Sequence, residues 1–276
     1  MMRLKNITVL IFSLLFFSSI LAIEAKINFE KDCVGMWLFD EGSGKVAKDS
    51  SSNKNHGSLK GNAKWGEGKF GNALQLKGAV SDYVEVKDND SLDMEEQITI
   101  MFWVSTSKKM NEAARWADRQ VVVGKHYQEY EVGIYDTGFL HTYTSDLAGG
   151  YDEGIMKSMG EVAGLDPDWK KNKWYHVAWT LDGKDEVAYV NGIKIGDHVK
   201  NNKGTQPGNH PLEFGRRVEG GLPLTGAIDE IAIFNVVLDE NDIKTVATSG
   251  LKQAFSVSPK SKLTTTWSVI KRRDNL

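Results

Sequence analysis

Short runs of alternating apolar and polar residues, separated by turn residues about every ten positions, constrain the fold of this chain most strongly. Residues 97–106, 174–181 and 226–234 are three such runs. Asn191-Gly192 separates two further runs and predicts a hairpin, because both positions of its turn take positive φ. About a dozen strands of this kind predict an all-β protein built from two packed antiparallel sheets.

The sequence also predicts one short C-terminal helix. Asp239 is a suitable N-cap and Gly250 a suitable stop, and Ile243 and Val246 give the segment between them an apolar side. We expect this helix to cover the mouth of the sandwich, where its apolar side would be buried.

The first residues differ from the rest of the chain. Arg3 and Lys5 precede an uncharged apolar run over 7–23, and the small residue Ala25 follows. This order is typical of a cleaved secretory signal. The run is slightly shorter than the about 20 apolar residues of a membrane-spanning helix. We therefore predict a signal peptide over 1–25, no membrane span after its cleavage, and a secreted protein, either extracellular or periplasmic.

The remaining chain is expected to form one domain over residues 29–251, because no linker rich in Pro, Gly or Ser divides it. The tail over 252–276 has no role that the sequence assigns. The formal net charge of -3 provides no basic surface for a nucleic acid, so no such partner is expected. We interpret the single cysteine, Cys33, as a small buried strand residue.

The run over 226–234 contains an anomaly. Simple alternation places Asp229 in one row with Ile231 and Ile233, and places Glu230 on the opposite face. A carboxylate on an apolar face is costly unless it is paired, hydrogen-bonded or bound to a metal ion. Asp229 is therefore expected to have a specific partner, and to tie its strand to the loop over 49–57.

An ordered set of segments resembles a known family. The chain is similar to the laminin G-like jelly roll of the concanavalin A-like lectin/glucanase superfamily, in its secreted bacterial type. The resemblance implies a two-sheet jelly-roll β-sandwich and covers most of the mature chain. The segments that carry it are Trp-Leu-Phe-Asp-Glu-Gly-Ser-Gly at 37–44, Asp-Ser-Ser-Ser-Asn-Lys-Asn-His-Gly at 49–57, Phe-Gly-Asn-Ala-Leu-Gln-Leu at 70–76, Tyr-Val-Glu-Val at 83–86, Ile-Thr-Ile-Met-Phe-Trp-Val at 98–104, Trp-Tyr-His-Val-Ala-Trp-Thr at 174–180, Val-Asn-Gly at 190–192 and Gly-Ala-Ile-Asp-Glu-Ile-Ala-Ile-Phe at 226–234.

The resemblance implies a structural calcium ion between an N-terminal loop and a returning strand. Calcium prefers oxygen ligands from carboxylates, amides and carbonyls. The corresponding candidates are Asp40, Asp49, Asn55 and Asp229. The alternative is that Asp49 and Asn55 form local side-chain turns and that Asp229 accepts backbone N–H bonds.

The superfamily also implies glycoside hydrolysis as a rival function. Such enzymes use two carboxylates about 5 Å apart. Glu129 and Glu131 have suitable spacing, but a solvated strand face explains the pair better, and Asp229 and Glu230 are expected on opposite faces. The six histidines show no zinc spacing on a helix, and no Gly-x-Ser-x-Gly motif occurs.

Aromatic residues in two long segments are candidates for ligand contact. Trp116, Tyr151 and Trp169 could stack on sugar rings, and the alternative is that they pack down as loop anchors. We predict a non-catalytic binding module that recognises a glycan or an extracellular protein. The alternatives are a glycoside hydrolase of the same superfamily and a purely structural extracellular or envelope protein.

Overall fold

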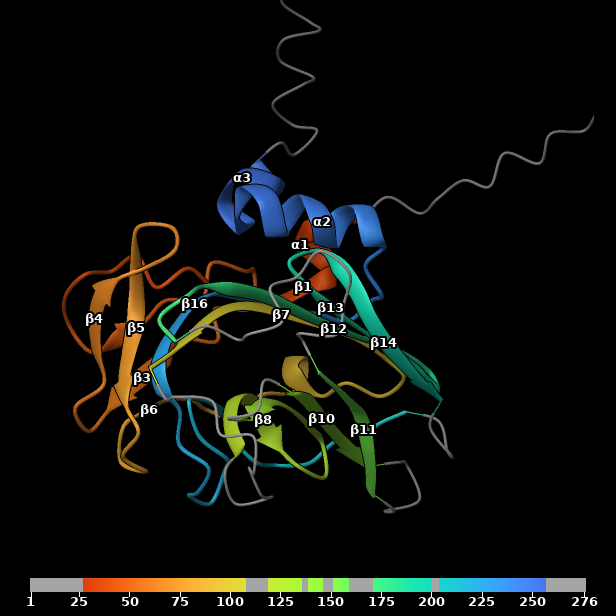
Figure 1. The fold of residues 1–276 in the computed structure, drawn as a ribbon, viewed down its shortest axis with the longest axis horizontal. Coiled ribbons are helices and arrows are strands. Elements are labelled where there is room, and N and C mark those ends of the chain that lie inside the picture. Colours follow the sequence, from red (N-terminus) through yellow and green to blue (C-terminus); the bar gives the residue numbers. More distant parts are fainter. Residues whose placement is uncertain are drawn as a thin grey trace, which may run out of the picture.

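The computed structural model describes residues 27–107, 119–135, 139–145, 151–158, 171–199 and 204–256. Two antiparallel eight-stranded sheets face each other and form the predicted sandwich (Figure 1). Sheet A runs in the order β14 (Ile193–Val199), β13 (Asp185–Val190), β12 (Tyr175–Asp182), β7 (Gln97–Thr106), β16 (Thr225–Phe234), β5 (Asn72–Lys77) and β4 (Lys64–Glu67), with β1 (Cys33–Trp37) also paired to β16. Sheet B runs in the order β11 (Tyr151–Ser158), β10 (Phe139–Ser145), β9 (Tyr130–Tyr135), β8 (Arg119–His126), β15 (Leu212–Phe214), β6 (Tyr83–Val86), β3 (Gly57–Lys60) and β2 (Val46–Ala47).

The strand predictions are confirmed in kind. Alternate residues of β7, such as Ile98, Ile100 and Phe102, point into an apolar core between the sheets. Asn191 and Gly192 join β13 to β14 with φ of 51° and 77°, so the predicted hairpin turn is present. Cys33 is buried in β1, as expected. Apolar burial between the two sheets is therefore the main source of stability.

The predicted C-terminal helix is α2 (Glu240–Ser249), and its caps are confirmed. The Asp239 side chain accepts a hydrogen bond from Asp242 N at 2.8 Å, and Gly250 ends the helix with φ of 78°. Three short elements accompany α2: α1 (Phe29–Asp32), the 3₁₀ turn η1 (Asp90–Leu92) and α3 (Leu251–Ser256). The prediction of a single helix at the C-terminal end of the domain therefore missed α3.

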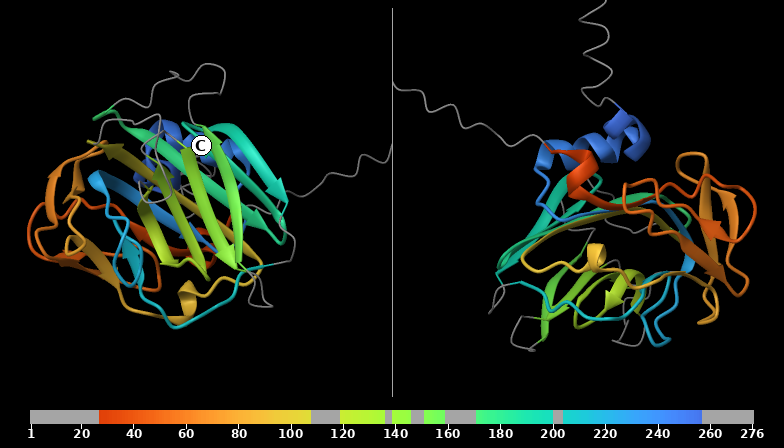
Figure 2. Two further views of the ribbon diagram at one scale, coloured as in Figure 1. Left: turned by 60° about the horizontal axis from the view of Figure 1, so that its bottom comes forward. Right: turned by 180° about the vertical axis from the view of Figure 1, so that it is seen from behind.

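The position of α2 differs from the expectation. Figures 1 and 2 show α2 and α3 on the outer face of sheet A, away from sheet B, and not at the mouth of the sandwich. A second apolar cluster under the helices includes Met101, Phe234, Ile243 and Val246. The outer side of sheet A is apolar at this end, so the helices are needed to cover it.

Strand β16 pairs with three neighbouring strands and contains a β-bulge. β7 pairs along one edge of β16. Along the other edge, β5 pairs with residues 225–228 and β1 pairs with residues 231–234, where Met36 lies opposite Ala232. The register against β7 shifts between Asp229 and Ala232, so one extra residue enters β16. Glu230 takes a φ of 48°, a conformation that residues with a Cβ rarely adopt.

The bulge corrects the predicted row of Asp229. Ile231 and Ile233 point into the core between the sheets. Asp229 instead lies on the outer side, where its Oδ2 accepts hydrogen bonds from Lys69 N at 2.8 Å and Phe70 N at 2.9 Å. The predicted shared row was wrong because the extra residue reverses the alternation within the strand. Asp229 also binds the turn over 68–71, and not the loop over 49–57.

Glu230 lies on the same side of sheet A as Asp229, so the prediction of opposite faces was also wrong. Its Oε2 accepts a hydrogen bond at 2.9 Å from Leu251 N, the first residue of α3. Gly250 lies between the Glu230 carboxylate and the turn that binds Asp229, since a Cβ built at Gly250 would approach both the Glu230 carboxylate and the Phe70 ring. The two adjacent carboxylates thus hold two separate segments against the sheet.

The Asp229 carboxyl is buried, with 0% of its surface exposed. Burial raises the pKa of Asp229 from 3.8 to about 7, and the hydrogen bond from Phe70 N opposes this rise only in part. Its Oδ1 has no hydrogen-bond partner among the described residues. Burial also raises the pKa of Glu230. At neutral pH the folded protein therefore holds a carboxylate whose ionisation is unfavourable.

We expect Asp229→Asn to stabilise the metal-free protein at pH 8 and to be neutral near pH 4. The folded pKa lies above the unfolded value, so wild-type stability falls as pH rises from about 4 to about 7 and then levels off. At about 1.4 kcal/mol per unit, the stabilisation at pH 8 is at most about 4 kcal/mol. The asparagine Oδ1 can replace the one oxygen that accepts both N–H bonds.

Urea unfolding between pH 4 and pH 8, in the presence of chelator, measures this difference. Asp185→Asn is the control, because it removes one carboxylate from an exposed position at the start of β13. Equal pH profiles for the wild type and Asp229→Asn would contradict the expectation.

Candidate functional site

Two of the predicted calcium ligands, Asp49 and Asn55, are engaged by the protein itself. Asp49 Oδ1 accepts hydrogen bonds from Met36 N at 2.8 Å and Ser51 N at 2.7 Å. Asp49 Oδ2 accepts from Ser51 Oγ at 2.7 Å and Asn55 N at 2.8 Å. The Asn55 amide donates to Ser91 Oγ at 2.9 Å. With four donors already on its two oxygens, the Asp49 carboxylate does not fit a calcium site.

The other two candidates, Asp40 and Asp229, border one turn. Asp40 Oδ1 accepts a hydrogen bond from Asn72 N at 3.2 Å, directly after the turn over 68–71 whose amides bind Asp229. A Cβ added at Gly71 would collide with the Asp40 carboxylate. Among the described residues, the carboxylates of Asp40, Asp49 and Asp229 do not form a metal-sized cluster. Oδ1 of Asp229 is buried and has no hydrogen-bond partner among the described residues.

The predicted ligand-binding aromatics fall largely outside the described residues. Trp116 and Trp169 lie outside them, and so does the side chain of Tyr151, the first residue of β11. Asn172 N donates to Thr106 O at 2.8 Å, so described residues flanking the two tryptophan-containing segments lie side by side. Ligand contact by these three aromatics stays a prediction.

The backbone of Tyr151 stands near a different group of side chains. Tyr151 pairs with Ser145, and Ser145 N donates to Gln128 O at 3.1 Å in the turn over 127–129. This turn joins β8 to β9 at one end of sheet B. The side chains around it form a polar and aromatic surface that the sequence did not reveal.

Arg217 is the centre of this surface. Its Nε donates to Glu131 Oε2 at 2.8 Å and its Nη2 to Glu131 Oε1 at 2.6 Å, in a forked pair. The guanidinium lies 5.3 Å from the ring centroid of Tyr127 and 5.6 Å from that of Tyr143. Its Nη1 has no protein acceptor among the described residues. Tyr127 is half-buried.

The neighbouring Arg216 is a useful contrast. It forms the same fork, with Glu213, at 2.7 and 2.9 Å, and lies 3.4 Å from the ring centroid of Tyr83. Its Nη1, however, donates to Val80 O at 2.7 Å. All three guanidinium nitrogens of Arg216 therefore donate to the protein, whereas Nη1 of Arg217 has no acceptor in the described part of the chain.

Glu129 and Glu131, the predicted hydrolytic pair, do not form a solvated strand face. Glu129 is 2% exposed and Glu131 is 0% exposed. Glu129 lies in the turn and not on β9. Its Oε2 forms an ion pair with the buried Lys125 Nζ at 2.6 Å. The interpretation as a solvated face was wrong because Arg217, which buries Glu131, comes from a distant part of the chain. Both carboxylates are engaged by cations, Glu129 by Lys125 and Glu131 by Arg217.

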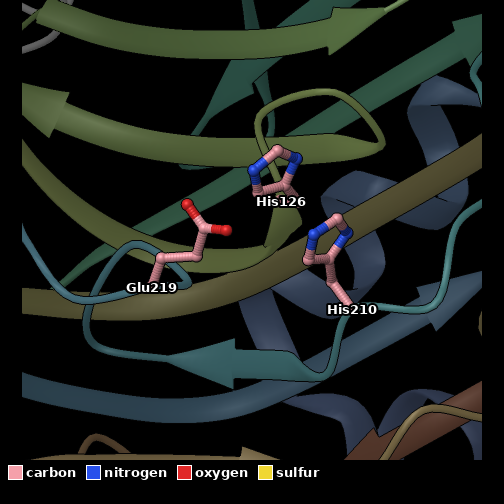
Figure 3. Close-up of side chains that lie close together, drawn as sticks. All are labelled: His126, His210 and Glu219. Atoms are coloured by element: carbon pink, nitrogen blue, oxygen red, sulfur yellow. The ribbon is translucent and has the colours of Figure 1, made fainter.

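Two histidines and a glutamate meet beside Tyr127, and sequence reasoning missed them. His126, His210 and Glu219 each offer a ligand-type atom, and these atoms lie within 4.8 Å of one another (Figure 3). The imidazole rings stack, with centroids 4.0 Å apart and planes at 9°. Local sequence carries no signal for this group, because its members come from three separate segments.

These features describe a lectin-type β-sandwich with a polar and aromatic surface at one end of sheet B. The chain belongs to the concanavalin A-like lectin/glucanases superfamily, since a Laminin G family model of that description matches residues 77–244. The resemblance noted in the sequence is thereby confirmed at the level of family and fold. No curated protein sequence matches the chain.

Solved structures agree on the fold. The binding domain of Paraclostridial Mosquitocidal Protein 1 matches with a TM-score of 0.64 and 22% identity, over 79% of this chain and 52% of that one. Domain 4 of AbnA, a GH43 extracellular arabinanase from Geobacillus stearothermophilus, in complex with arabinotriose, matches with a TM-score of 0.57 and 18% identity, over 79% of this chain and 99% of that one. The botulinum neurotoxin serotype D ligand binding domain in complex with N-acetylneuraminic acid matches with a TM-score of 0.60 and 16% identity, over 80% of this chain and 51% of that one.

This chain spans about half the length of the mosquitocidal and neurotoxin domains that it matches. At these identities the similarity shows the fold and leaves the ligand to the site itself. In the described part of the chain, no helix is both long enough and apolar enough to cross a membrane.

We expect Asp49→Ala to destabilise the protein by at least about 3 kcal/mol, because three buried N–H groups and a hydroxyl lose their acceptor. Urea unfolding in calcium-free buffer measures the loss. Asp185→Ala, the same change at an exposed position, should have little effect. A loss below about 1 kcal/mol for Asp49→Ala would contradict the role of Asp49 as the acceptor that closes this loop.

Proposed function

We propose that the chain is a non-catalytic glycan-binding module and that glycans contact the surface formed by Tyr127, Arg217 and His210. The observation that carries this proposal is the contrast between the two arginines. Nη1 of Arg217 has no acceptor among the described residues and lies beside the partly buried Tyr127, while the same nitrogen of Arg216 donates to the backbone.

The arrangement suits a sugar for physical reasons. The flat face of an aromatic ring packs against the apolar face of a pyranose or furanose ring. The fork to Glu131 and the stacking on two tyrosines fix the guanidinium before a ligand arrives, which reduces the entropy lost on binding. The N–H groups of Nη1 can then donate to a hydroxyl, ring or carboxylate oxygen of the sugar.

Two of the similar structures add support, because one is in complex with arabinotriose and another with N-acetylneuraminic acid. The second candidate is recognition of a receptor protein, favoured by the binding domains among the structural neighbours. A hydrolytic role is less well supported, because Glu129 and Glu131 are both held in ion pairs. Secretion, predicted from residues 1–25, agrees with an extracellular ligand.

A structural calcium ion remains part of the proposal in a narrower form. Asp229 and Asp40, at the turn over 68–71, are the residues that would hold the ion. Asp49 and Asn55 are not ligands in this proposal. The feature that supports Asp229 as a ligand is its buried Oδ1, which has no hydrogen-bond partner among the described residues and would be stabilised by a cation.

We expect Tyr127→Ala to weaken glycan binding at least fivefold, a cost of about 1 kcal/mol, because the stacking surface is lost. An array that includes sialylated and arabino-oligosaccharide probes identifies the glycan, and calorimetry measures its affinity. Tyr83→Ala is the matched control, since it removes the ring stacked on Arg216, whose three guanidinium nitrogens all have protein acceptors. Thermal midpoints verify that both variants fold.

Full affinity in Tyr127→Ala, combined with a loss in Trp116→Ala/Trp169→Ala, would move the contact to the predicted tryptophans. No bound glycan on the array would leave receptor recognition as the better proposal.

Calcium is tested separately by thermal unfolding with the ion or with chelator. If the ion binds, free calcium at about 100 times its dissociation constant adds about 2.7 kcal/mol to the wild type. Asp229→Asn should lose this response, and Asp185→Asn should keep it. Magnesium at equal concentration controls for ionic strength. An unchanged wild-type midpoint removes calcium from the proposal.

A further inference from the structure

We propose that His126, His210 and Glu219 form a zinc-binding site at the end of sheet B. The site does not depend on glycan binding or on the proposed calcium ion. It uses the end of β8, the segment before β15 and the turn between β15 and β16. Figure 3 shows that each imidazole turns one nitrogen toward the Glu219 carboxylate. The three candidate ligand atoms therefore lie close together at the end of sheet B.

The distances are within reach of coordination. Zinc bonds to imidazole nitrogen and carboxylate oxygen of about 2.0–2.2 Å imply separations of about 3.3 Å between tetrahedral ligand atoms. The three candidate atoms lie within 4.8 Å of one another. Glu219 is exposed on a turn and can close the remaining gap by changing its rotamer. His210 must tilt out of its stack on His126, since parallel rings direct their lone pairs along parallel lines.

His210 already has the outer partner that a zinc-bound histidine requires. Its Nδ1 lies 2.7 Å from Glu129 Oε1, and Glu129 is held in turn by Lys125 Nζ at 2.6 Å. A carboxylate on one imidazole nitrogen fixes the proton there and leaves the lone pair of the other nitrogen for the metal. A tilt about the Nδ1–Oε1 hydrogen bond would bring Nε2 toward the ion without breaking this contact.

His126 is the most buried of the three proposed ligands. It is 4% exposed, and its φ of 142° is unusual for a residue with a Cβ. Metal binding requires a neutral imidazole with a lone pair on the coordinating nitrogen. His126 Nδ1 accepts a long hydrogen bond of 3.3 Å from Gln128 N. Coordination through Nε2 would shift the ring proton to Nδ1 and release that weak bond.

The ligand set selects zinc over calcium or magnesium. Two imidazoles with one carboxylate suit zinc, whereas the harder alkaline-earth ions prefer oxygen ligands alone. Three protein ligands leave a fourth position open, and His210 and Glu219 place it toward solvent. A water molecule or an oxygen of a bound partner would complete the tetrahedron.

The test uses the full chain without a polyhistidine tag, stripped with chelator and dialysed against zinc chloride. We expect one zinc ion per chain. His210→Ala and Glu219→Gln should each weaken binding at least about tenfold, because each removes one of three ligands. Cobalt substitution gives a second readout, since a tetrahedral site produces absorption bands that should vanish in both variants. Thermal midpoints without metal show whether the variants fold.

His56→Asn is the matched control, because it removes an exposed histidine and keeps an acceptor for the Asp49 N–H bond. It should bind zinc as the wild type does. Binding of less than one ion per chain by the wild type overturns the proposal. So does a zinc affinity in His210→Ala and Glu219→Gln equal to that of the wild type.

Discussion

The bulge at Glu230 is the constraint on which the arrangement of sheet A depends. One edge of β16 has to accept β5 along its first half and β1 along its second half. The extra residue lies where these two partners meet, and it places the Asp229 and Glu230 carboxylates on the outer side of the sheet. There they bind amides of the turn over 68–71 and of α3. A single break in register therefore fixes both the junction of three strands and the layer that covers it.

This arrangement has an electrostatic cost. Two adjacent carboxylates are buried, and the pKa of each is raised, first of all by that burial. Backbone N–H groups offset part of the cost, but the orphaned Oδ1 of Asp229 leaves part of it uncompensated. A fold that retains such a group without gain would be less stable than one with an amide in its place. The uncompensated charge is thus the physical ground for considering a cation at this position.

The sequence predicted those parts of the structure that follow from local chemistry. Alternating runs, the Asn191-Gly192 turn and the caps of α2 depend on residues within a few positions of one another, and all three were predicted. The side of the sheet on which Asp229 lies was not predicted, because the position of a bulge depends on how the neighbouring strands pair. The ion pair of Glu131 with Arg217 was also invisible, since the two residues are separated by 86 positions. The same reason hides the meeting of His126 with His210.

The end of sheet B shows how the core can prepare a surface for binding. Lys125 is buried, and its ammonium group forms an ion pair with Glu129 Oε2. Glu129 uses its other oxygen to hold His210 at the surface. An ion pair in the interior thereby orients a group that meets solvent. The fork of Glu131 on Arg217 acts in the same way on the next strand. Such buried charge pairs contribute little net stability, but they fix the geometry of exposed donors. A rigid sheet with preset polar groups at its end is what a binding module requires, whatever ligand it takes.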